Sequence, residues 1–173
     1  MMTLAISEVE KLSEQHIVAD FRCGKHWLDH FLRKYALTNQ RVDSSQTWVV
    51  HRENVVIGYY TLVYGGASLD EMPPALSQDM PRHRIGIMLL ACWAVDEKEQ
   101  GQGIGKALLK DAFVRIVSAA EIGGLKAIVI DAIDDEMAVW YRDHGFTDCP
   151  IGSQTGKQRL MISIQDVRAS LGM

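Results

Sequence analysis

The sequence predicts a single α/β domain, residues 1–173, built around a central mixed sheet. Apolar residues recur at helical spacing near the start, and two strand-like segments separated by a turn follow them. In the second half, two continuous apolar runs of strand length alternate with helical segments. The predicted order is therefore helix, hairpin, strand–helix–strand–helix and a last strand, in a chain long enough to bury a sizeable core.

The first half of the chain predicts one helix, one hairpin and one long loop. Apolar positions at helical spacing indicate a helix over residues 24–39: Trp27, Leu28, Phe31, Leu32, Tyr35 and Ala36. The segments "TWVVHR" (47–52) and "VVIGYYTLVYG" (55–65), with "ENV" as the turn, predict the hairpin because β-branched and aromatic residues fill them. Residues 69–84 carry three of the four prolines and predict a loop of a length that is often functional.

The second half predicts alternating strands and helices. In order, they are a buried strand over 85–96, a helix over 103–120, a buried strand over 125–133, a short helix over 134–145 and a strand over 159–164. Gly123 and Gly124 end the connection between the helix over 103–120 and the strand over 125–133. The short helix has acidic residues in its first turn and Gly145 at its C-terminal end, which is the polarity that a helix favours.

Composition and charge exclude several classes of protein. No apolar run approaches the roughly 20 residues that a membrane helix needs, and the start lacks the basic and apolar regions of a secretory signal. Cys23, Cys92 and Cys149 are too scattered for a CxxC metal or redox motif, and an odd number of cysteines fits a reducing cytoplasm. A net charge of -4 argues against a general nucleic-acid coat, although it leaves room for a local basic patch.

The stretch "QGQGIGKALL" (100–109) is typical of an anion-binding turn. Ala107 stands where a Walker A loop requires a hydroxyl residue, and Lys106 and Leu108 stand where a dinucleotide-binding pattern requires glycine. What remains is Gln-x-x-Gly-x-Gly between a buried strand and a helix. Its glycines let backbone N–H groups approach an anion, and the helix N-terminus adds partial positive charge. This arrangement suits a pyrophosphate held without metal, although a tight turn without a ligand would show the same pattern.

These residues resemble the GNAT superfamily of acyl-CoA-dependent N-acyltransferases. Gln100, Gly103 and Gly105 match its Arg/Gln-x-x-Gly-x-Gly/Ala signature, and "AVWYRDHGF" (138–146) looks like its late A-x-x-F/Y-Y-x-x-x-GF element. The resemblance implies a mostly antiparallel sheet with splayed central strands, flanked by helices, and acetyl-CoA as the donor. It also implies that the donor is held along one strand and the turn that follows: Trp93, Ala94, Val95, Gln100, Gly101, Gln102, Gly103, Ile104, Gly105 and Lys106.

The opening segment narrows the resemblance to TacT/AtaT-type toxin acetyltransferases. "FRCGKHWLDHFLRKYALTNQ" (21–40) is similar to the opening of that group, and so are "VVIGYYTLVYG" and "AAEIGGLKAIVIDAIDDEM". Such enzymes acetylate the α-amine of aminoacyl-tRNA and block translation. The resemblance therefore implies aminoacyl-tRNA as the acceptor and a ribbon-helix-helix antitoxin as the partner. It is also compatible with a homodimer.

The central strand departs from the pattern of this group. The group reads L-G-R-L-A-V/I-D, whereas this chain reads Leu-Ala-Cys-Trp-Ala-Val-Asp from Leu90 to Asp96, so Cys92 replaces the arginine. Three hypotheses therefore stand: an aminoacyl-tRNA acetyltransferase toxin, an acetyltransferase for a small amine or a protein N-terminus, and a non-catalytic acyl-CoA-binding module. The intact glycine turn and Tyr141 argue against the third hypothesis.

Amine attack on a thioester needs a free amine and an acid for the departing thiolate. The resemblance assigns the acid to Tyr141, because a phenol is protonated at neutral pH; the alternative is a packing tyrosine. No base stands out, since Asp96, Glu99 and His144 are interpreted as capping or solvated residues. An α-amine, with a pKa of about 8, is partly neutral without one. Five basic residues are candidate contacts to tRNA phosphates or solvated surface residues: Arg33, Lys34, Arg41, Arg82 and Arg84.

Overall fold

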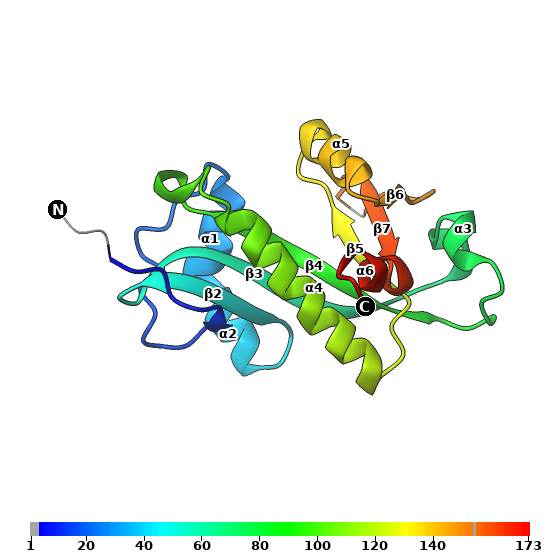
Figure 1. Ribbon diagram of the computed structural model, residues 1–173, viewed down its shortest axis with the longest axis horizontal. Helices are drawn as coiled ribbons and strands as arrows, with labels where there is room; N and C mark the ends of the chain where they lie inside the picture. Colours follow the sequence, from blue (N-terminus) through cyan, green and yellow to red (C-terminus); the bar gives the residue numbers. More distant parts are fainter. Residues whose placement is uncertain (1–3, 154) are drawn as a thin grey trace. The chain divides into compact units, whose positions relative to one another are not determined.

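A computed structural model describes residues 4–153 and 155–173 and confirms the α/β class. Seven strands form one sheet in the order β1-β2-β3-β4-β5-β7-β6 (Figure 1). The β4–β5 pair is parallel, and the β1–β2, β2–β3, β5–β7 and β6–β7 pairs are antiparallel, as the predicted mixed, mostly antiparallel sheet requires. The chain divides into two compact units, of which unit 1 runs to Val63 and includes Ala91–Ala112, and unit 2 comprises Tyr64–Leu90 and Phe113–Met173.

The elements follow the predicted order. Those that begin in unit 1 or enter it are β1 (Glu10–Lys11), α1 (His26–Lys34), α2 (Ala36–Arg41), β2 (Gln46–Arg52), β3 (Val55–Ala67), β4 (Ile85–Val95), the 3-10 turn η2 (Glu97–Glu99) and α4 (Ile104–Ile122). Those within unit 2 are the 3-10 turn η1 (Leu69–Glu71), α3 (Pro74–Ser77), β5 (Ala127–Asp131), α5 (Asp135–Asp143), β6 (Thr147–Asp148), β7 (Arg159–Ser163) and α6 (Ile164–Ser170). Strands β3 and β4 and helix α4 contribute residues to both units.

The predicted helix over residues 24–39 is two helices, α1 and α2, separated at Tyr35. Tyr35 has φ -119° and ψ -31°, yet its N–H still donates to the Phe31 carbonyl, and its carbonyl accepts from the Asn39 N–H. Leu28, Leu32 and Ala36 stay buried across the break. The apolar spacing therefore continues through a local change in backbone angle, which is why periodicity alone predicted one helix.

The predicted loop over residues 69–84 contains two short helical segments, η1 and α3. The Ser68 and Glu71 side chains form a capping box at the start of η1. Pro74 occupies the first turn of α3, where a missing N–H costs nothing. The sequence predicts a loop from these prolines, whereas in the structure Pro74 begins a short helix.

Four further elements are not predicted by the sequence: β1, β6, α6 and the 3-10 turn η2. The first two are two-residue strands, too short to carry a periodic signal. Helix α6 follows β7 directly, and the Ser163 hydroxyl caps it by accepting from the Asp166 N–H at 3.0 Å.

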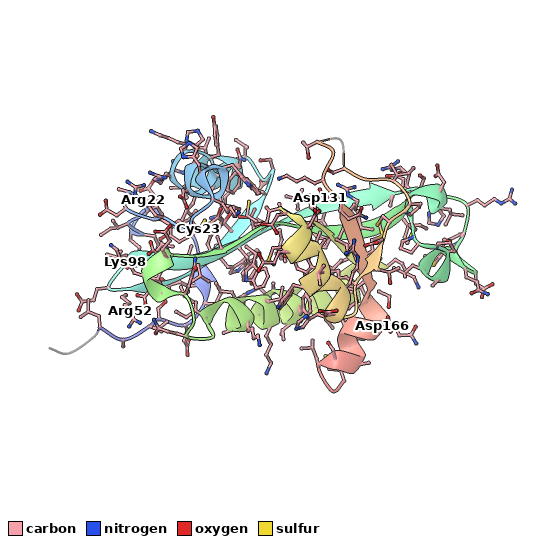
Figure 2. The ribbon with its side chains drawn as sticks, turned by 90° about the horizontal axis from the view of Figure 1, so that it is seen from above. Arg22, Cys23, Arg52, Lys98, Asp131 and Asp166 are labelled. Atoms are coloured by element: carbon pink, nitrogen blue, oxygen red, sulfur yellow. The ribbon has the colours of Figure 1, made fainter. Side chains whose placement is uncertain are left out.

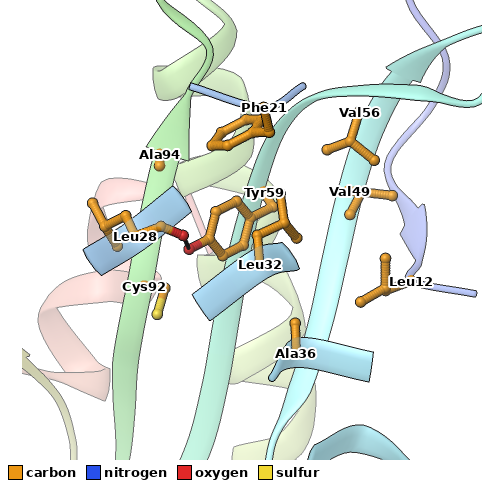
Figure 3. Close-up of a cluster of buried hydrophobic side chains, with 10 residues drawn as sticks. All are labelled: Leu12, Phe21, Leu28, Leu32, Ala36, Val49, Val56, Tyr59, Cys92 and Ala94. Carbon is orange, nitrogen blue, oxygen red and sulfur yellow. Dashed lines mark hydrogen bonds between the residues drawn. The ribbon is translucent and has the colours of Figure 1, made fainter. Parts of the chain in front are cut away.

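The core of unit 1 lies where α1 and α2 pack against β2, β3 and β4 (Figure 3). Its buried residues are Leu12, Phe21, Leu28, Leu32, Ala36, Val49, Val56, Tyr59, Cys92 and Ala94. The Tyr59 hydroxyl, wholly enclosed by this cluster, donates to the Leu28 carbonyl at 2.7 Å (Figure 3). This bond gives a buried phenol its partner and fixes α1 against β3.

The core of unit 2 includes residues of β4, β5, β7 and the 69–84 segment. Ala127, Val129 and Met161 are fully enclosed in it. A Cβ added at Gly86 would lie 2.0 Å from the Gly124 carbonyl oxygen, so only glycine permits this close approach of two backbones. The Lys126 N–H donates to the Gly86 carbonyl at 2.8 Å and extends the contact into the parallel β4–β5 pair.

Across the described ranges 4–153 and 155–173, the structure has no helix with the length and apolar character needed to cross a bilayer.

Candidate active site

The turn between β4 and α4 is anchored at Asp96, which is buried. One oxygen of the Asp96 carboxylate accepts from the Lys98 N–H at 3.0 Å, and the other accepts from the Arg22 N–H at 3.1 Å. The Asp96 N–H donates to the Ile57 carbonyl at 2.8 Å. These contacts match the interpretation of Asp96 as a capping residue, because its carboxylate is occupied in holding two backbone segments together.

Gly101 and Gly103 give the turn the geometry of an anion cradle. They have φ of +84° and +83°, a region that residues with a side chain rarely adopt. A Cβ at either position would meet nothing within 4 Å, so each glycine faces open space. Helix α4 begins at Ile104 immediately afterwards, so its first backbone N–H groups and its positive end face the same turn. The residues present therefore fit a pyrophosphate bound by backbone donors.

Gly105 has a different role from the two glycines before it. It lies inside α4, where a Cβ would stand 3.6 Å from both Trp93 Cζ2 and Val95 Cγ2, an ordinary van der Waals distance. The Trp93 indole N–H donates to the Gly105 carbonyl at 2.9 Å and ties β4 to the first turn of α4. Alanine fits at this position, whereas a larger side chain would push the indole away.

The glutamines of the turn brace it with their side chains. The Gln100 amide nitrogen donates to the Val95 carbonyl at 2.9 Å and to the Cys23 carbonyl at 3.1 Å. That of Gln102 donates to Glu99 at 3.2 Å. A cofactor contact of Gln100 or Gln102 through the backbone stays a prediction. Lys106 is exposed on the first turn of α4.

An ion pair between Arg52 and Glu99 braces this end of unit 1, where Figure 2 labels Arg22, Arg52 and Lys98. Arg52 holds both oxygens of Glu99, at 2.9 and 3.0 Å, and thereby lowers the pKa of that carboxyl. Glu99 is therefore a paired anion and not a free base. A cavity of about 250 Å³ lies beside the turn and is lined by Asp20, Arg22, Asp96, Glu97 and Lys98.

Strand β4 presents alternate residues to two environments. Cys92 and Ala94 are buried in the core of unit 1, whereas Trp93 and Val95 are half-buried and contact the start of α4. The cysteine that replaces the expected arginine is therefore a core residue, 4% exposed beside Tyr59 and Leu28. The substitution removes a charge from a position that would have to bury it.

The three cysteines are not prepared as nucleophiles. Burial, followed by the neighbouring Asp29 carboxylate, raises the pKa of Cys23 to about 12, and burial raises the pKa of Cys149 to about 11. Cys92 is enclosed in the core. Since the thiolate is the reactive form, this environment favours direct transfer of an acyl group over a route through an acyl-cysteine.

Tyr141 lies in unit 2, on α5, and is 5% exposed. Its ring makes edge contacts with Phe146, at a centroid distance of 5.3 Å, and with Trp140 at 5.4 Å. Burial raises the pKa of Tyr141 above its usual value, so the phenol keeps its proton well beyond neutral pH. His144 stacks on Trp140 at a centroid distance of 3.8 Å, and its Nδ1 lies 2.7 Å from the Trp140 carbonyl oxygen.

The predicted basic contacts fall in both units. In unit 1, Arg33 binds the Asp29 carbonyl, Lys34 is exposed, and Arg41 pairs with Glu14. In unit 2, Arg82 and Arg84 are exposed, and the Arg84 guanidinium donates to the Gly66 carbonyl. Two of the five have acidic partners: Arg41 pairs with Glu14, and the Arg33 guanidinium lies 3.9 Å from the Asp29 carboxylate.

Glu10, His16 and His51 are the one trio among the described residues whose ligand atoms lie close enough to hold a metal ion. However, each histidine accepts a backbone N–H at Nδ1, from Ser13 and Asn54 respectively, both at 2.9 Å. A neutral ring then carries its hydrogen on Nε2, and both Nε2 atoms face Glu10 Oε1, at 2.7 and 2.6 Å. The trio is therefore a hydrogen-bonded clamp whose nitrogen lone pairs point away from the shared centre.

The fold and the turn together define a class. A mixed sheet whose central strand leads through a glycine cradle into a helix is suited to an enzyme that holds the pyrophosphate of an acyl donor by backbone groups. A family profile described as "Acetyltransferase (GNAT) domain" matches residues 43–148, which include the cradle and Tyr141. The chain belongs to this family and is an acetyltransferase.

The relatives extend the match over almost the whole chain. The tRNA-acetylating toxin of Mycobacterium tuberculosis (strain ATCC 25618 / H37Rv) is 36% identical over 166 residues, covering 96% of this chain and 97% of the relative. The probable toxin TacT of Sinorhizobium fredii (strain NBRC 101917 / NGR234) is 26% identical over 168 residues, covering 91% of each chain.

Solved structures agree on the fold. A crystal structure described as a bacterial toxin superimposes with a TM-score of 0.88 at 20% identity, covering 98% of this chain and 97% of that one. AtaT complexed with acetyl-methionyl-tRNAfMet superimposes with a TM-score of 0.85 at 22% identity, covering 96% of this chain and 99% of that one. At these identities the likeness establishes the architecture.

Proposed function

We propose that this protein transfers the acetyl group of acetyl-CoA to the α-amine of an aminoacyl-tRNA and thereby blocks translation. The observation that carries the proposal is the 36% identity, over nearly the full length, to a tRNA-acetylating toxin. The open cradle at Gly101 and Gly103 supports a pyrophosphate-bearing donor. Both features fit one enzyme, in which the whole chain acts as a single acetyltransferase domain.

The residues predicted to bind acetyl-CoA hold the donor, and Tyr141 moves a proton. Acetyl-CoA supplies an activated thioester carbonyl when it is bound. The backbone N–H groups of residues 101–106 hold its pyrophosphate, and backbone groups of Trp93 to Val95 hold its pantetheine arm. Tyr141 keeps a proton at Oη, from which it protonates the departing thiolate.

The acceptor needs no strong base from the protein. Asp96 and Glu99 are committed to structural contacts, and His144 is held against Trp140. An α-amine has a pKa of about 8 and is neutral in roughly a tenth of molecules at pH 7, whereas a lysine amine, with a pKa of about 10.4, is almost entirely charged. The site therefore favours the amine of an aminoacyl ester over a lysine side chain.

We further infer a protein partner and a cytoplasmic location. A neighbouring structure, AtaT, is described bound to the C-terminus of the antitoxin AtaR and acetyl-CoA, and another is a KacTA–DNA complex. By analogy, this chain binds a small antitoxin of the ribbon-helix-helix class, and its enzyme unit is a homodimer. Charged tRNA is found in the cytoplasm, where the reaction must take place.

Expression in a bacterium, with and without the candidate antitoxin, tests the proposal. Without the antitoxin, we expect growth arrest and acetylated aminoacyl ends on tRNA, and a Tyr141→Phe variant should leave both growth and tRNA unchanged. Acetylation of a small metabolite amine in cells whose charged tRNA stays unmodified would support the alternative of a small-amine acetyltransferase and remove the toxin assignment.

A further inference from the structure

The outer face of α1 carries exposed rings that the fold does not use. His26, His30 and Tyr35 are exposed, while the opposite face buries Leu28 and Leu32 in the core of unit 1. Among the described phenylalanine, tyrosine and tryptophan side chains, those most exposed are Trp27 at 42%, Tyr35 at 51% and Tyr64 at 68%. Two of these three, Trp27 and Tyr35, thus lie on α1 and at the residue that caps its C-terminal end.

The rings form an ordered row. His26 and His30 are one helical turn apart and stack with a centroid distance of 5.9 Å and an interplanar angle of 22°. His30 meets Tyr35 edge-on, at 5.4 Å and 74°. We call His26, His30 and Tyr35 the ring ladder. Alanine is a better helix former than histidine or tyrosine, and ring contacts along a helix contribute only tenths of a kcal/mol, so the helix itself gains little from the ladder.

Lys34 places a positive charge beside the ladder, although the whole chain is acidic. The acidic residue of α1, Asp29, is buried and accepts the Cys23 N–H at 2.8 Å, so it does not face solvent with the rings. Lys34 lies one turn beyond His30 on the same stripe and is exposed. Exposed rings beside cations are the combination that binds unpaired nucleotides, whose bases stack on rings while their phosphates meet the charges.

The ladder begins beside the anion cradle. The Arg22 N–H donates to Asp96, the Glu97 N–H donates to the Arg22 carbonyl at 2.7 Å, and Gln100 donates to the Cys23 carbonyl. The segment that enters α1 is therefore bonded directly to the turn that leads into the cradle, within unit 1. A ligand bound to the ladder would therefore lie on α1, the helix that follows the segment bonded to this turn.

We propose that the ring ladder of α1 binds unpaired nucleotides of an RNA acceptor by base stacking, with Lys34 contacting a phosphate. The inference rests on the proposed function and deepens it, because it names the chemical part of the RNA that the enzyme recognises. A duplex, whose bases are already stacked on one another, offers no faces to the ladder.

The test measures RNA binding without any acetyl transfer. Three radiolabelled probes are used: a short single-stranded RNA, the same strand with abasic riboses, and the same strand annealed into a duplex. We expect His30→Ala and Tyr35→Ala to weaken binding of the intact single strand by roughly 5- to 100-fold, as for the loss of one stacked base. Both variants should bind the abasic strand and the duplex as the unaltered protein does.

Three matched variants separate stacking from charge and from general surface effects. His30→Phe should keep near-normal affinity because a ring remains. Lys34→Ala should reduce the slope of log affinity against log salt by about 0.7, the value expected for one phosphate contact on a single strand. Tyr64→Ala, which removes an exposed tyrosine outside α1, should change nothing. Thermal melting of each variant checks that folding is intact.

Two results would overturn the inference. One is unchanged affinity of the His30→Ala and Tyr35→Ala proteins for the intact strand. The other is an equal loss for the intact and abasic strands, which would assign the effect to charge alone. Acetylation of charged tRNA is measured separately, so the proposed function can stand while the ladder fails, and the ladder can bind RNA while the proposed function fails.

Discussion

Single residues of the cradle have separable roles. Gly103 is required by its backbone angle, whereas Gly105 is limited only by the space in front of Trp93. We expect Gly103→Ala to strain the turn and weaken acetyl-CoA binding strongly, and Gly105→Ala to bind almost normally. Calorimetry on the two folded variants checks this difference. Equal affinities for both variants would show that the positive φ of Gly103 does not shape the donor site.

Tyr141 should separate binding from turnover. In the Tyr141→Phe protein the ring still packs against Phe146, so affinity for acetyl-CoA should be kept, while the rate should fall by about 10²- to 10⁴-fold because the proton is lost. Stopped-assay rates and calorimetry on the same preparation measure the two effects. A variant that retains nearly the full rate would remove Tyr141 from the mechanism.

The pH dependence follows from the direction of the Tyr141 shift. A raised pKa means that the folded protein holds the phenolic proton beyond the usual value of about 10, so Tyr141 stays an acid throughout the neutral and mildly alkaline range. The rate should rise with pH as the acceptor amine loses its proton, and it should not fall again below about pH 10. A descending limb near pH 8 would require a different acid.

At the scale of elements, the Glu10 clamp joins β1 to the β2–β3 hairpin. His16 is enclosed and would lose its partner in a Glu10→Ala protein, at a cost of about 1–3 kcal/mol for a buried polar group left unsatisfied. Chemical unfolding of the two proteins measures this loss. Chelator treatment should leave the melting temperature unchanged, since the lone pairs of the clamp do not face a shared centre.

The sign of the pH effect on the clamp is fixed by Glu10. Hydrogen bonds from His16 and then His51 lower the pKa of Glu10, so its contribution to stability is present above the usual pKa of about 4.5. It should be lost as the pH falls through the lowered value. The Glu10→Gln protein should show a weaker acid dependence of unfolding than the unaltered protein.

Elements with a strong local signal were predictable, and those set by tertiary contacts were not. The strand over 85–96 and the helix over 103–120 appear as β4 and α4 to within two residues, because a continuous apolar run and a glycine turn mark them. The break at Tyr35 was invisible because the buried positions keep their spacing through it. The short strand β1 forms only because β2 pairs with it.

The candidate site was partly predictable for the same reason. The glycines of the cradle stand out in the sequence, and two of the three have the left-handed backbone that the chemistry needs. The sequence does not reveal that Cys92 faces the core, since this depends on which side of β4 the residue occupies. It does not reveal that the Gln100 side chain donates to two carbonyls either, since this depends on how the turn after η2 folds. The helical periodicity includes the rings of Trp27, Phe31 and Tyr35, although the structure exposes Trp27 and Tyr35.

At the scale of the whole molecule, the charge of -4 contrasts with the two basic residues, Arg33 and Lys34, in the last turn of α1. If phosphate contacts contribute, the rate on charged tRNA should fall steeply with added salt, because neutralised phosphates release counterions. Acetylation of a small amine by the same preparation should hardly respond. Initial rates across a salt series for the two acceptors check this, and parallel salt curves would contradict a role for RNA phosphates.

The central claim is that the acceptor is the α-amine of an aminoacyl-tRNA, and a competition for labelled acetyl groups tests it most directly. Radiolabelled acetyl-CoA is supplied with charged tRNA, free amino acids, polyamines and a lysine-rich peptide in one reaction, with the Tyr141→Phe protein as control. We predict that label enters charged tRNA and, after mild alkaline hydrolysis of the ester, is recovered as an N-acetyl amino acid. Label found only in a small amine or in the peptide would contradict the account.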